Sequence, residues 1–223
     1  MNIPKIMETQ DGQWTLGSVE RFSISDAIAL TQLGGDGSHV APLGGRSPVV
    51  IHEMPDVGRL VIKRYLRGGM LNRFLGDRYF KLAPCRARTE FEILLRAASH
   101  GINVPEPLAF LQRGKWIYQC WLMTRFVPNR GTLAQISKGE SSIECMGQVA
   151  DQTRQMIDHG IYHVDFHPGN VILGEDGRVY LLDFDKAVVT NMSKSRLRTK
   201  YVKRWNRAVL KHGLSHSLLN PSF

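Results

Sequence analysis

The stretch His163-Val-Asp-Phe-His-Pro-Gly-Asn-Val-Ile-Leu-Gly-Glu-Asp-Gly-Arg-Val-Tyr-Leu-Leu-Asp-Phe-Asp185 decides the fold. Its middle predicts a β-hairpin, because two apolar runs, 170–173 and 178–182, flank the turn residues Gly174-Glu-Asp-Gly177. Such a hairpin brings Asp165, Asn170 and Asp183 to one end. Phosphoryl transfer from a metal-bound triphosphate needs hard oxygen ligands for Mg²⁺ and a separate carboxylate that accepts a proton. The stretch therefore predicts a site for that chemistry.

The order of these residues resembles the catalytic segment of protein kinases, H-R-D-x-x-x-x-N followed by a second metal-binding Asp. On this pattern Asp165 is expected to be the catalytic base, with Asn170 and Asp183 as ligands of Mg²⁺. The competing explanation is that all three are turn formers at strand ends. Each residue alone favours that explanation, whereas their common order and the hairpin between them argue against coincidence. We assign His163 and His167 structural roles.

Upstream residues supply candidates for contacts to the nucleotide phosphates. The predicted strand 59–65 carries Lys63, in the place of a phosphate-binding lysine. Gly44 and Gly45 form a short turn before that strand, where backbone N–H groups can approach phosphate oxygens because no Cβ obstructs them. The glycines of 34–37 are a competing candidate, which we interpret as a mobile loop.

A helix is predicted over 88–100, with apolar residues at helical intervals and Gly101 at its end. Its place along the chain suits a helix whose glutamate pairs with Lys63. Glu90 and Glu92 both qualify on position alone. Further on, the predicted strand 116–123 leads into 124–128, a hinge whose backbone is expected to hold adenine through Thr124 and Phe126.

Two later segments have helical periodicity. The helix from about Ser141 to Gly160 starts with a capping box and carries an apolar face that predicts core packing beneath the catalytic segment. The stretch 186–211 contains nine basic residues and no acidic one, with Leu197, Tyr201 and Trp205 among them. It predicts an amphipathic helix that packs mainly on the protein. We interpret the leucines beyond Gly213 as a looser interfacial tail.

Taken together, several runs resemble the lipopolysaccharide kinases. They are Lys63-Arg-Tyr-Leu-Arg-Gly-Gly69, Asp77-Arg-Tyr79, Arg88-Thr-Glu-Phe91, Val104-Pro-Glu-Pro107, Asp165-Phe-His-Pro-Gly-Asn170 and Leu182-Asp-Phe-Asp-Lys186. The resemblance implies an α+β, protein-kinase-like bilobal fold in a single catalytic domain, with a β-rich N-lobe (about 1–124), a hinge (124–130) and a short, minimal helical C-lobe (131–223). It selects Glu90 as the partner of Lys63. It also implies transfer of the γ-phosphate of ATP, with Mg²⁺, to a hydroxyl of 3-deoxy-D-manno-octulosonic acid (Kdo) on a lipid A precursor.

The chain departs from ordinary protein kinases in three ways. Asp185 stands where the flexible Gly of Asp-Phe-Gly would be, so switching by inversion of that loop is not expected. Val164 replaces the Arg that would bind a phosphorylated activation loop. About forty residues follow Asp183, without an Ala-Pro-Glu signature, so no peptide-docking subdomain is expected. These departures favour a sugar or lipid acceptor over a protein.

The formal net charge is +9, from 29 basic and 20 acidic residues. Such an excess raises the local concentration of anionic ligands and of anionic membrane surface. Arg64, Arg67, Arg73 and Arg78 are the weaker candidates for acceptor phosphates, because arginine forks suit phosphate and carboxylate oxygens. Nucleic-acid binding is the rival explanation of the charge, but no RNA-binding signature accompanies it.

No apolar run approaches the roughly twenty residues that span a bilayer, and no secretory signal is evident. We therefore expect a cytosolic monomer without nucleic acid, peripheral on the inner face of the inner membrane of a Gram-negative bacterium. Cys85, Cys120 and Cys145 fit reduced thiols. Three alternatives stay open: a kinase for heptose or an antibiotic-type sugar, a catalytically dead scaffold, and a nucleic-acid-binding module.

Overall fold

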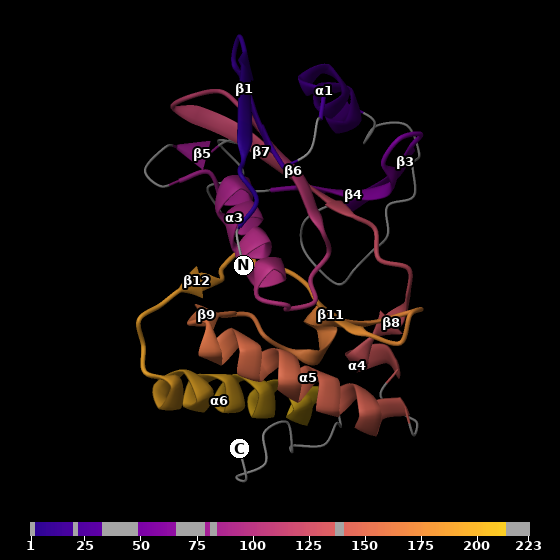
Figure 1. Ribbon diagram of the computed structural model, residues 1–223, viewed down its shortest axis with the longest axis vertical. Helices are drawn as coiled ribbons and strands as arrows, with labels where there is room; N and C mark the ends of the chain where they lie inside the picture. Colours follow the sequence, from indigo (N-terminus) through magenta and orange to yellow (C-terminus); the bar gives the residue numbers. More distant parts are fainter. Residues whose placement is uncertain are drawn as a thin grey trace. The chain divides into compact units, whose positions relative to one another are not determined.

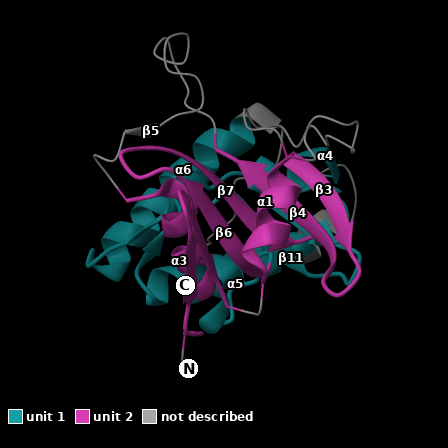
Figure 2. Ribbon diagram, turned by 90° about the horizontal axis from the view of Figure 1, so that it is seen from above, with its two compact units in different colours: residues 1–2, 96–105, 127–223 teal, residues 3–95, 106–126 magenta. Residues whose placement is uncertain are grey.

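The computed structural model describes residues 3–19, 22–32, 49–65, 79–80, 84–136 and 141–212. The fold is α+β, as the sequence predicts, and the chain forms two compact units (Figure 2). The N-terminal unit comprises 3–95 and 106–126, and the C-terminal unit comprises 96–105 and 127–223 together with 1–2. Residues 96–105 lie in the C-terminal unit, unlike the predicted lobes. One reason is that Asn103 N–H donates to Gln152 Oε1 (2.6 Å) and Asn103 O accepts from Leu181 N–H (2.9 Å).

The N-terminal unit is built on an antiparallel sheet with the strand order β1-β2-β6-β7-β4-β3, and β5 pairs with β7. The strands are β1 (Met7–Asp11), β2 (Trp14–Ser18), β3 (Val49–Met54), β4 (Gly58–Arg64), β5 (Tyr79–Phe80), β6 (Pro107–Arg113) and β7 (Ile117–Arg125). The predicted strands around Lys63 and over 116–123 are therefore confirmed as β4 and β7. The hairpin β1–β2 was not predicted.

Side chains alternate between the two faces of this sheet. Leu60 and Ile62 of β4 pack on one face with Ala27 and Leu30 of α1 (Ile24–Gln32). The other face carries Lys63 and meets α3 (Arg86–Ser99), which confirms the helix predicted over 88–100. Ring contact between Phe91 of α3 and Phe110 of β6, 5.5 Å between centroids, joins α3 to that face. The sheet is thus covered on both sides.

The C-terminal unit contains the predicted hairpin, β10 (Val171–Gly174) and β11 (Val179–Leu181), paired antiparallel. Gly177 adopts a φ of 78° in the turn between them, a conformation that glycine takes without steric cost. The remaining elements are β8 (Asn129–Thr132), α4 (Leu133–Ile136), α5 (Ser141–Asp158), β9 (Ile161–Tyr162), the 3₁₀ turn η2 (Pro168–Asn170), β12 (Val188–Val189) and α6 (Lys194–His212). β8 extends the hairpin, and β9 pairs with β12.

The helices α5 and α6 lie side by side in the C-terminal unit (Figure 1). One face of α6 is fully buried, through Leu197, Tyr201, Trp205 and Val209. The prediction that this basic helix packs mainly on the protein is therefore confirmed. Its exposed face carries basic residues and one apolar residue, Leu210, which is 67% exposed. The proposed tail beyond Gly213 lies outside the described residues.

The three cysteines are buried and unbridged, in agreement with the expected reduced thiols. Among the described residues, no helix combines the length and the apolar character that crossing a bilayer requires.

Candidate active site

The hairpin of the C-terminal unit brings the three predicted catalytic residues together. The side-chain amide of Asn170 donates from Nδ2 to the backbone oxygen of Asp165 (3.0 Å), which ties these two positions. Leu182 N–H donates to Asn170 O (2.8 Å), so Asp183 follows directly beside Asn170. The cluster thus places two carboxylates and one amide oxygen at the end of the hairpin, as predicted from its turn.

Asp183 is the only non-glycine residue with a positive φ, 62°, in the part of the chain that the structure describes. Aspartate tolerates this left-handed region better than most residues, although such a conformation is uncommon. The following Phe184 is fully buried and contacts the ring of His163, 4.5 Å between centroids. A buried neighbour therefore holds Asp183 in an otherwise disfavoured conformation.

Two histidines fix the catalytic segment through backbone contacts, which matches the structural roles assigned to them. His163 is 1% exposed and donates from Nε2 to Leu182 O (2.8 Å). Burial lowers the pKa of His163, against the opposing effects of that hydrogen bond and the charges of Asp183 and Asp165. His167 Nδ1 accepts from Gly169 N–H (3.1 Å) and caps η2. A Cβ on Gly169 would lie 2.9 Å from the His167 ring, so any larger residue there would displace that ring.

Residues of α6 support the same segment, and sequence reasoning did not find them. The hydroxyl of Tyr201 accepts from His163 N–H (2.8 Å) and donates to Ile161 O (2.9 Å). Phe166 packs between Tyr201 and Trp205, with centroids 5.4 and 5.0 Å away. The segment before and after Asp165 is thereby anchored to one buried helix face.

The carboxylate of Asp165 forms an ion pair with Arg204 of α6. Both side chains are partly exposed, Asp165 to 37% and Arg204 to 31%, so the pair is accessible from solvent. The sequence offered no signal for this contact, because Arg204 is one of nine basic residues in 186–211. A cation at this place orients the carboxylate that is predicted to accept a proton.

The N-terminal unit brings Lys63 and Glu90 together. Lys63 Nζ lies 2.9 and 3.2 Å from the two carboxylate oxygens of Glu90, which is 2% exposed. The buried Tyr65 also donates its hydroxyl to Glu90, a contact that sequence reasoning missed. Glu92, the rejected candidate, instead pairs with Arg88 on the surface of α3 (2.8 Å). Glu90 thus holds Lys63 in one orientation on the sheet.

The other predicted site residues have a position in or next to the sheet, or lie outside the described residues. Thr124 lies within the central strand β7, and Phe126 N–H donates to Arg59 O (2.9 Å), so that N–H is already used inside the protein. Arg64 shares the sheet face of Leu60 and Ile62, opposite Lys63, with its guanidinium 5.9 Å from the Trp121 ring. Five further candidates, Gly44, Gly45, Arg67, Arg73 and Arg78, lie outside the described residues.

The chemistry of the catalytic cluster fits a magnesium ion. Asn170 uses its NH₂ group on Asp165 O, which directs its oxygen away from that bond, and Asp183 supplies a carboxylate. Within the described ranges no group of three or more His, Cys, Asp or Glu side chains forms a metal centre. Mg²⁺ characteristically takes only one or two protein carboxylates and completes its shell with phosphate oxygens and water. The donor set therefore suits magnesium brought in with a nucleotide.

A kinase-type catalytic segment in one unit and a lysine–glutamate pair on a β-sheet in the other define a kinase-like phosphotransferase. Comparison with known proteins gives the family: residues 40–220 match the lipopolysaccharide kinase (Kdo/WaaP) family, and the chain belongs to it. It is therefore a kinase of lipopolysaccharide biosynthesis.

Relatives support this assignment. The chain is 31% identical over 199 residues to the 3-deoxy-D-manno-octulosonic acid kinase of Xanthomonas oryzae pv. oryzae (strain PXO99A), covering 86% of this chain and 78% of that protein. Proteins of the same name from Xylella fastidiosa (strain 9a5c) and Vibrio cholerae are each 29% identical. Those matches cover 79% and 70% of this chain, and 72% and 69% of the respective relatives.

Proposed function

We propose that this protein transfers the γ-phosphate of ATP to a hydroxyl of Kdo on a lipid A precursor. The observation that carries the proposal is the cluster of Asp165, Asn170 and Asp183 at the hairpin end, held by hydrogen bonds in a chain of the lipopolysaccharide kinase family. The relatives named above are Kdo kinases, which supports Kdo as the sugar.

In the proposed reaction Asp165 accepts the proton of the attacking sugar hydroxyl, while Arg204 keeps its carboxylate oriented toward the acceptor. Asn170 and Asp183 would hold magnesium. When bound, that ion would neutralise charge on the phosphate oxygens. Lys63, fixed by Glu90, would contact the nucleotide phosphates, and Gly44 and Gly45 would do so through backbone N–H groups. The hydrogen bond from Asn170 to the backbone oxygen of Asp165 and the ion pair with Arg204 restrain Asp165, which suits a base that must keep one position.

The remaining roles are supported by position rather than by contacts. Adenine would be held by the backbone near Thr124 and Phe126; because Phe126 N–H is already bonded to Arg59, this residue would offer its carbonyl oxygen. Among the weaker acceptor candidates, Arg67, Arg73 and Arg78 retain that role in the proposal. Arg64 is disfavoured because it lies on the sheet face opposite Lys63.

We also propose that the protein acts as a monomer on the cytoplasmic face of the inner membrane, in peripheral contact with anionic lipid. The lipid contact is supported by the exposed face of α6, where Arg196, Lys203 and Arg207 accompany Leu210. Basic side chains near anionic headgroups contribute about 1 kcal/mol each, an attraction that salt weakens. Sedimentation with anionic and neutral vesicles at two salt concentrations tests the lipid contact. Equal binding to the anionic and the neutral vesicles would contradict it.

The proposed reaction is tested by incubating the purified protein with Mg-ATP and a Kdo-bearing lipid A precursor. A heptose-bearing core and total RNA serve as parallel acceptors, and mass spectrometry locates any new phosphate. Phosphate on Kdo would support the proposal. Phosphate on heptose alone would keep the mechanism and change the acceptor, whereas absence of transfer to any acceptor would support a catalytically dead scaffold.

A further inference from the structure

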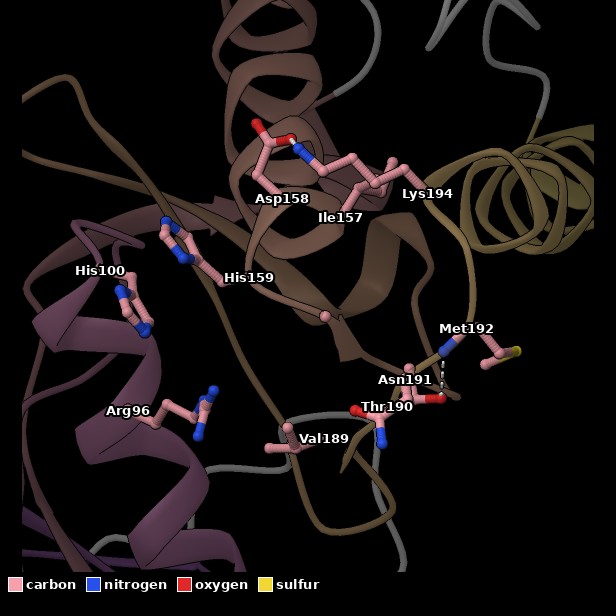
Figure 3. Close-up of a pocket in the computed structure, with 11 residues that line it drawn as sticks. Arg96, His100, Ile157, Asp158, His159, Val189, Thr190, Asn191, Met192 and Lys194 are labelled. Carbon is pink, nitrogen blue, oxygen red and sulfur yellow. Dashed lines mark hydrogen bonds and ion pairs between the residues drawn. The ribbon is translucent and has the colours of Figure 1, made fainter.

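A polar hollow lies in the C-terminal unit, with a volume of about 410 Å³ (Figure 3). Three segments line it: the end of α3 with Arg96 and His100, the end of α5 with the following turn (157–160), and 189–194 up to the start of α6. The hollow is open to solvent. Asp165, Asn170 and Asp183 do not line it. This hollow is therefore separate from the catalytic cluster.

The rings of His100 and His159 are stacked at one side of the hollow, 3.7 Å apart and inclined by only 8° (Figure 3). The only carboxylate in the lining, Asp158, is already paired with Lys194 at 2.6 Å. Arg96 therefore contributes a positive charge that no acidic lining residue offsets. The lining thus favours an anion over a cation or an apolar ligand.

The Arg96 side chain is the lining group best suited to bind an anion. In the part of the chain described here, its Nε atom is buried without a hydrogen-bond partner, and its guanidinium forms no ion pair. The Nε atom itself is not accessible to solvent, so an anion in the hollow would bind through the terminal NH₂ groups of this guanidinium. Guanidinium groups bind phosphate oxygens through paired N–H donors. Arg96 is therefore the residue around which we expect the ligand to bind.

The electrostatics of the stacked pair agree with this. Desolvation lowers the pKa of His100 first, and the neighbouring His159 and Arg96 lower it further. A dianion in the hollow would act in the opposite direction and raise the pKa of His100. Binding of a phosphate should consequently be visible at both histidine rings.

We propose that this hollow is a binding site for a phosphate group, with Arg96 as its main anchor and His100 and His159 as supporting donors. The phosphate could belong to the glycolipid acceptor or be free in solution, and both sources present the same group to Arg96. The site is inferred from its lining residues alone. Only the identification of the glycolipid acceptor as its ligand rests on the proposed function.

The test uses ¹⁵N-labelled protein with Asp165→Asn, so that no turnover intervenes, and follows the imidazole resonances of His100 and His159 by NMR. Inorganic phosphate is titrated against chloride at equal ionic strength. We expect saturable shifts with phosphate alone, and at least about tenfold weaker binding in Arg96→Gln, the effect of losing one charge-assisted contact. Arg154→Gln is the matched control, since Arg154 is an exposed arginine outside the hollow that pairs with Asp151.

Shifts equal to those with chloride, or phosphate binding that Arg96→Gln leaves unchanged, would overturn the proposal. Should Arg96→Gln fail to fold, His159→Gln replaces it. A smaller loss of phosphate affinity is expected there, because His159 is a supporting donor, and unchanged affinity would overturn the proposal. A second arm compares the glycolipid acceptor with its dephosphorylated form: shifts with the phosphorylated form alone assign the site to the acceptor, and shifts with inorganic phosphate alone assign it to the free anion. Phosphoryl transfer is a separate readout, so failure of one proposal does not imply failure of the other.

Discussion

Arg204 and Asp165 form an ion pair although 39 residues separate them in the chain. The pair joins α6 to the segment that is predicted to carry the catalytic base. Tyr201 and Trp205 of the same helix pack against that segment. Arg204 is therefore held by a packed helix and not by a loop. A carboxylate held in this way retains one direction, which a base aligned with an acceptor hydroxyl requires.

We expect Arg204→Gln to lower kcat by about tenfold to a hundredfold, the range that loss of alignment produces. KM for ATP should change little, because Arg204 contacts Asp165 and no predicted nucleotide residue. Arg204→Lys should restore part of the activity by keeping the charge. Steady-state kinetics on the three proteins measure this, with Arg154→Gln as control because Arg154 is exposed on α5 and pairs with Asp151. Equal kcat in Arg204→Gln and wild type would contradict the positioning role.

Glu90→Gln should weaken ATP binding by about tenfold, since it leaves Lys63 without its charged partner. Isothermal titration with a non-hydrolysable ATP analogue measures this. Glu92→Gln is the matched control on the same helix, since Glu92 pairs only with Arg88 at the surface. The same affinity in Glu90→Gln and Glu92→Gln would exclude a specific role for the Lys63–Glu90 pair.

Tyr201→Phe should destabilise the protein by about 1–3 kcal/mol, because His163 N–H and Ile161 O lose a buried hydrogen-bond partner. Urea unfolding followed by circular dichroism gives the free energy. Tyr162→Phe serves as control, since Tyr162 is only half-buried and contacts the ring of Tyr201 without bonding to that backbone. An unchanged unfolding midpoint in Tyr201→Phe would show that water replaces the hydroxyl.

The neutral, buried His163 predicts a loss of stability in mild acid. Its pKa in the folded protein lies below the ordinary value of 6.5, so the unfolded chain binds the proton more readily. The stability that neutral His163 contributes is therefore complete above about pH 6.5. It is lost as the pH falls from 6.5 toward the lowered pKa of His163 in the folded protein. His163→Gln, which keeps a donor for Leu182 O, should show a smaller fall in the unfolding free energy between pH 7 and pH 5. An identical pH dependence in both proteins would contradict this assignment.

The sequence predicted those parts of the site that local patterns encode. The hairpin around Asp165, Asn170 and Asp183 followed from its turn residues, and Lys63 from a predicted strand. The helix pattern left Glu90 and Glu92 open, and the resemblance to the lipopolysaccharide kinases selected Glu90. The hairpin β1–β2 also carries a local signal at its turn, where Gly12 adopts a φ of 55° between the paired residues Asp11 and Trp14.

The contacts of Tyr65, Tyr201 and Arg204 could not be predicted in this way. Each depends on how separate elements pack, and neither the hydroxyl of a tyrosine nor one cation in a basic run reveals its partner. The predicted hinge contact at Phe126 illustrates the same limit, because the use of its N–H by Arg59 O depends on the pairing of distant strands.

The most direct measurement is phosphate transfer by Asp165→Asn, compared with wild type and with Asp176→Asn, whose carboxylate lies in the hairpin turn. Each protein is mixed with Mg-ATP and the Kdo-bearing lipid A precursor, the product is quantified by mass spectrometry, and ATP binding is measured in parallel. The account predicts that Asp165→Asn binds ATP normally and loses at least about a hundredfold in transfer to Kdo, the lower end of the contribution of a general base, while Asp176→Asn remains active. Undiminished transfer by Asp165→Asn would contradict the assignment of Asp165 as the base.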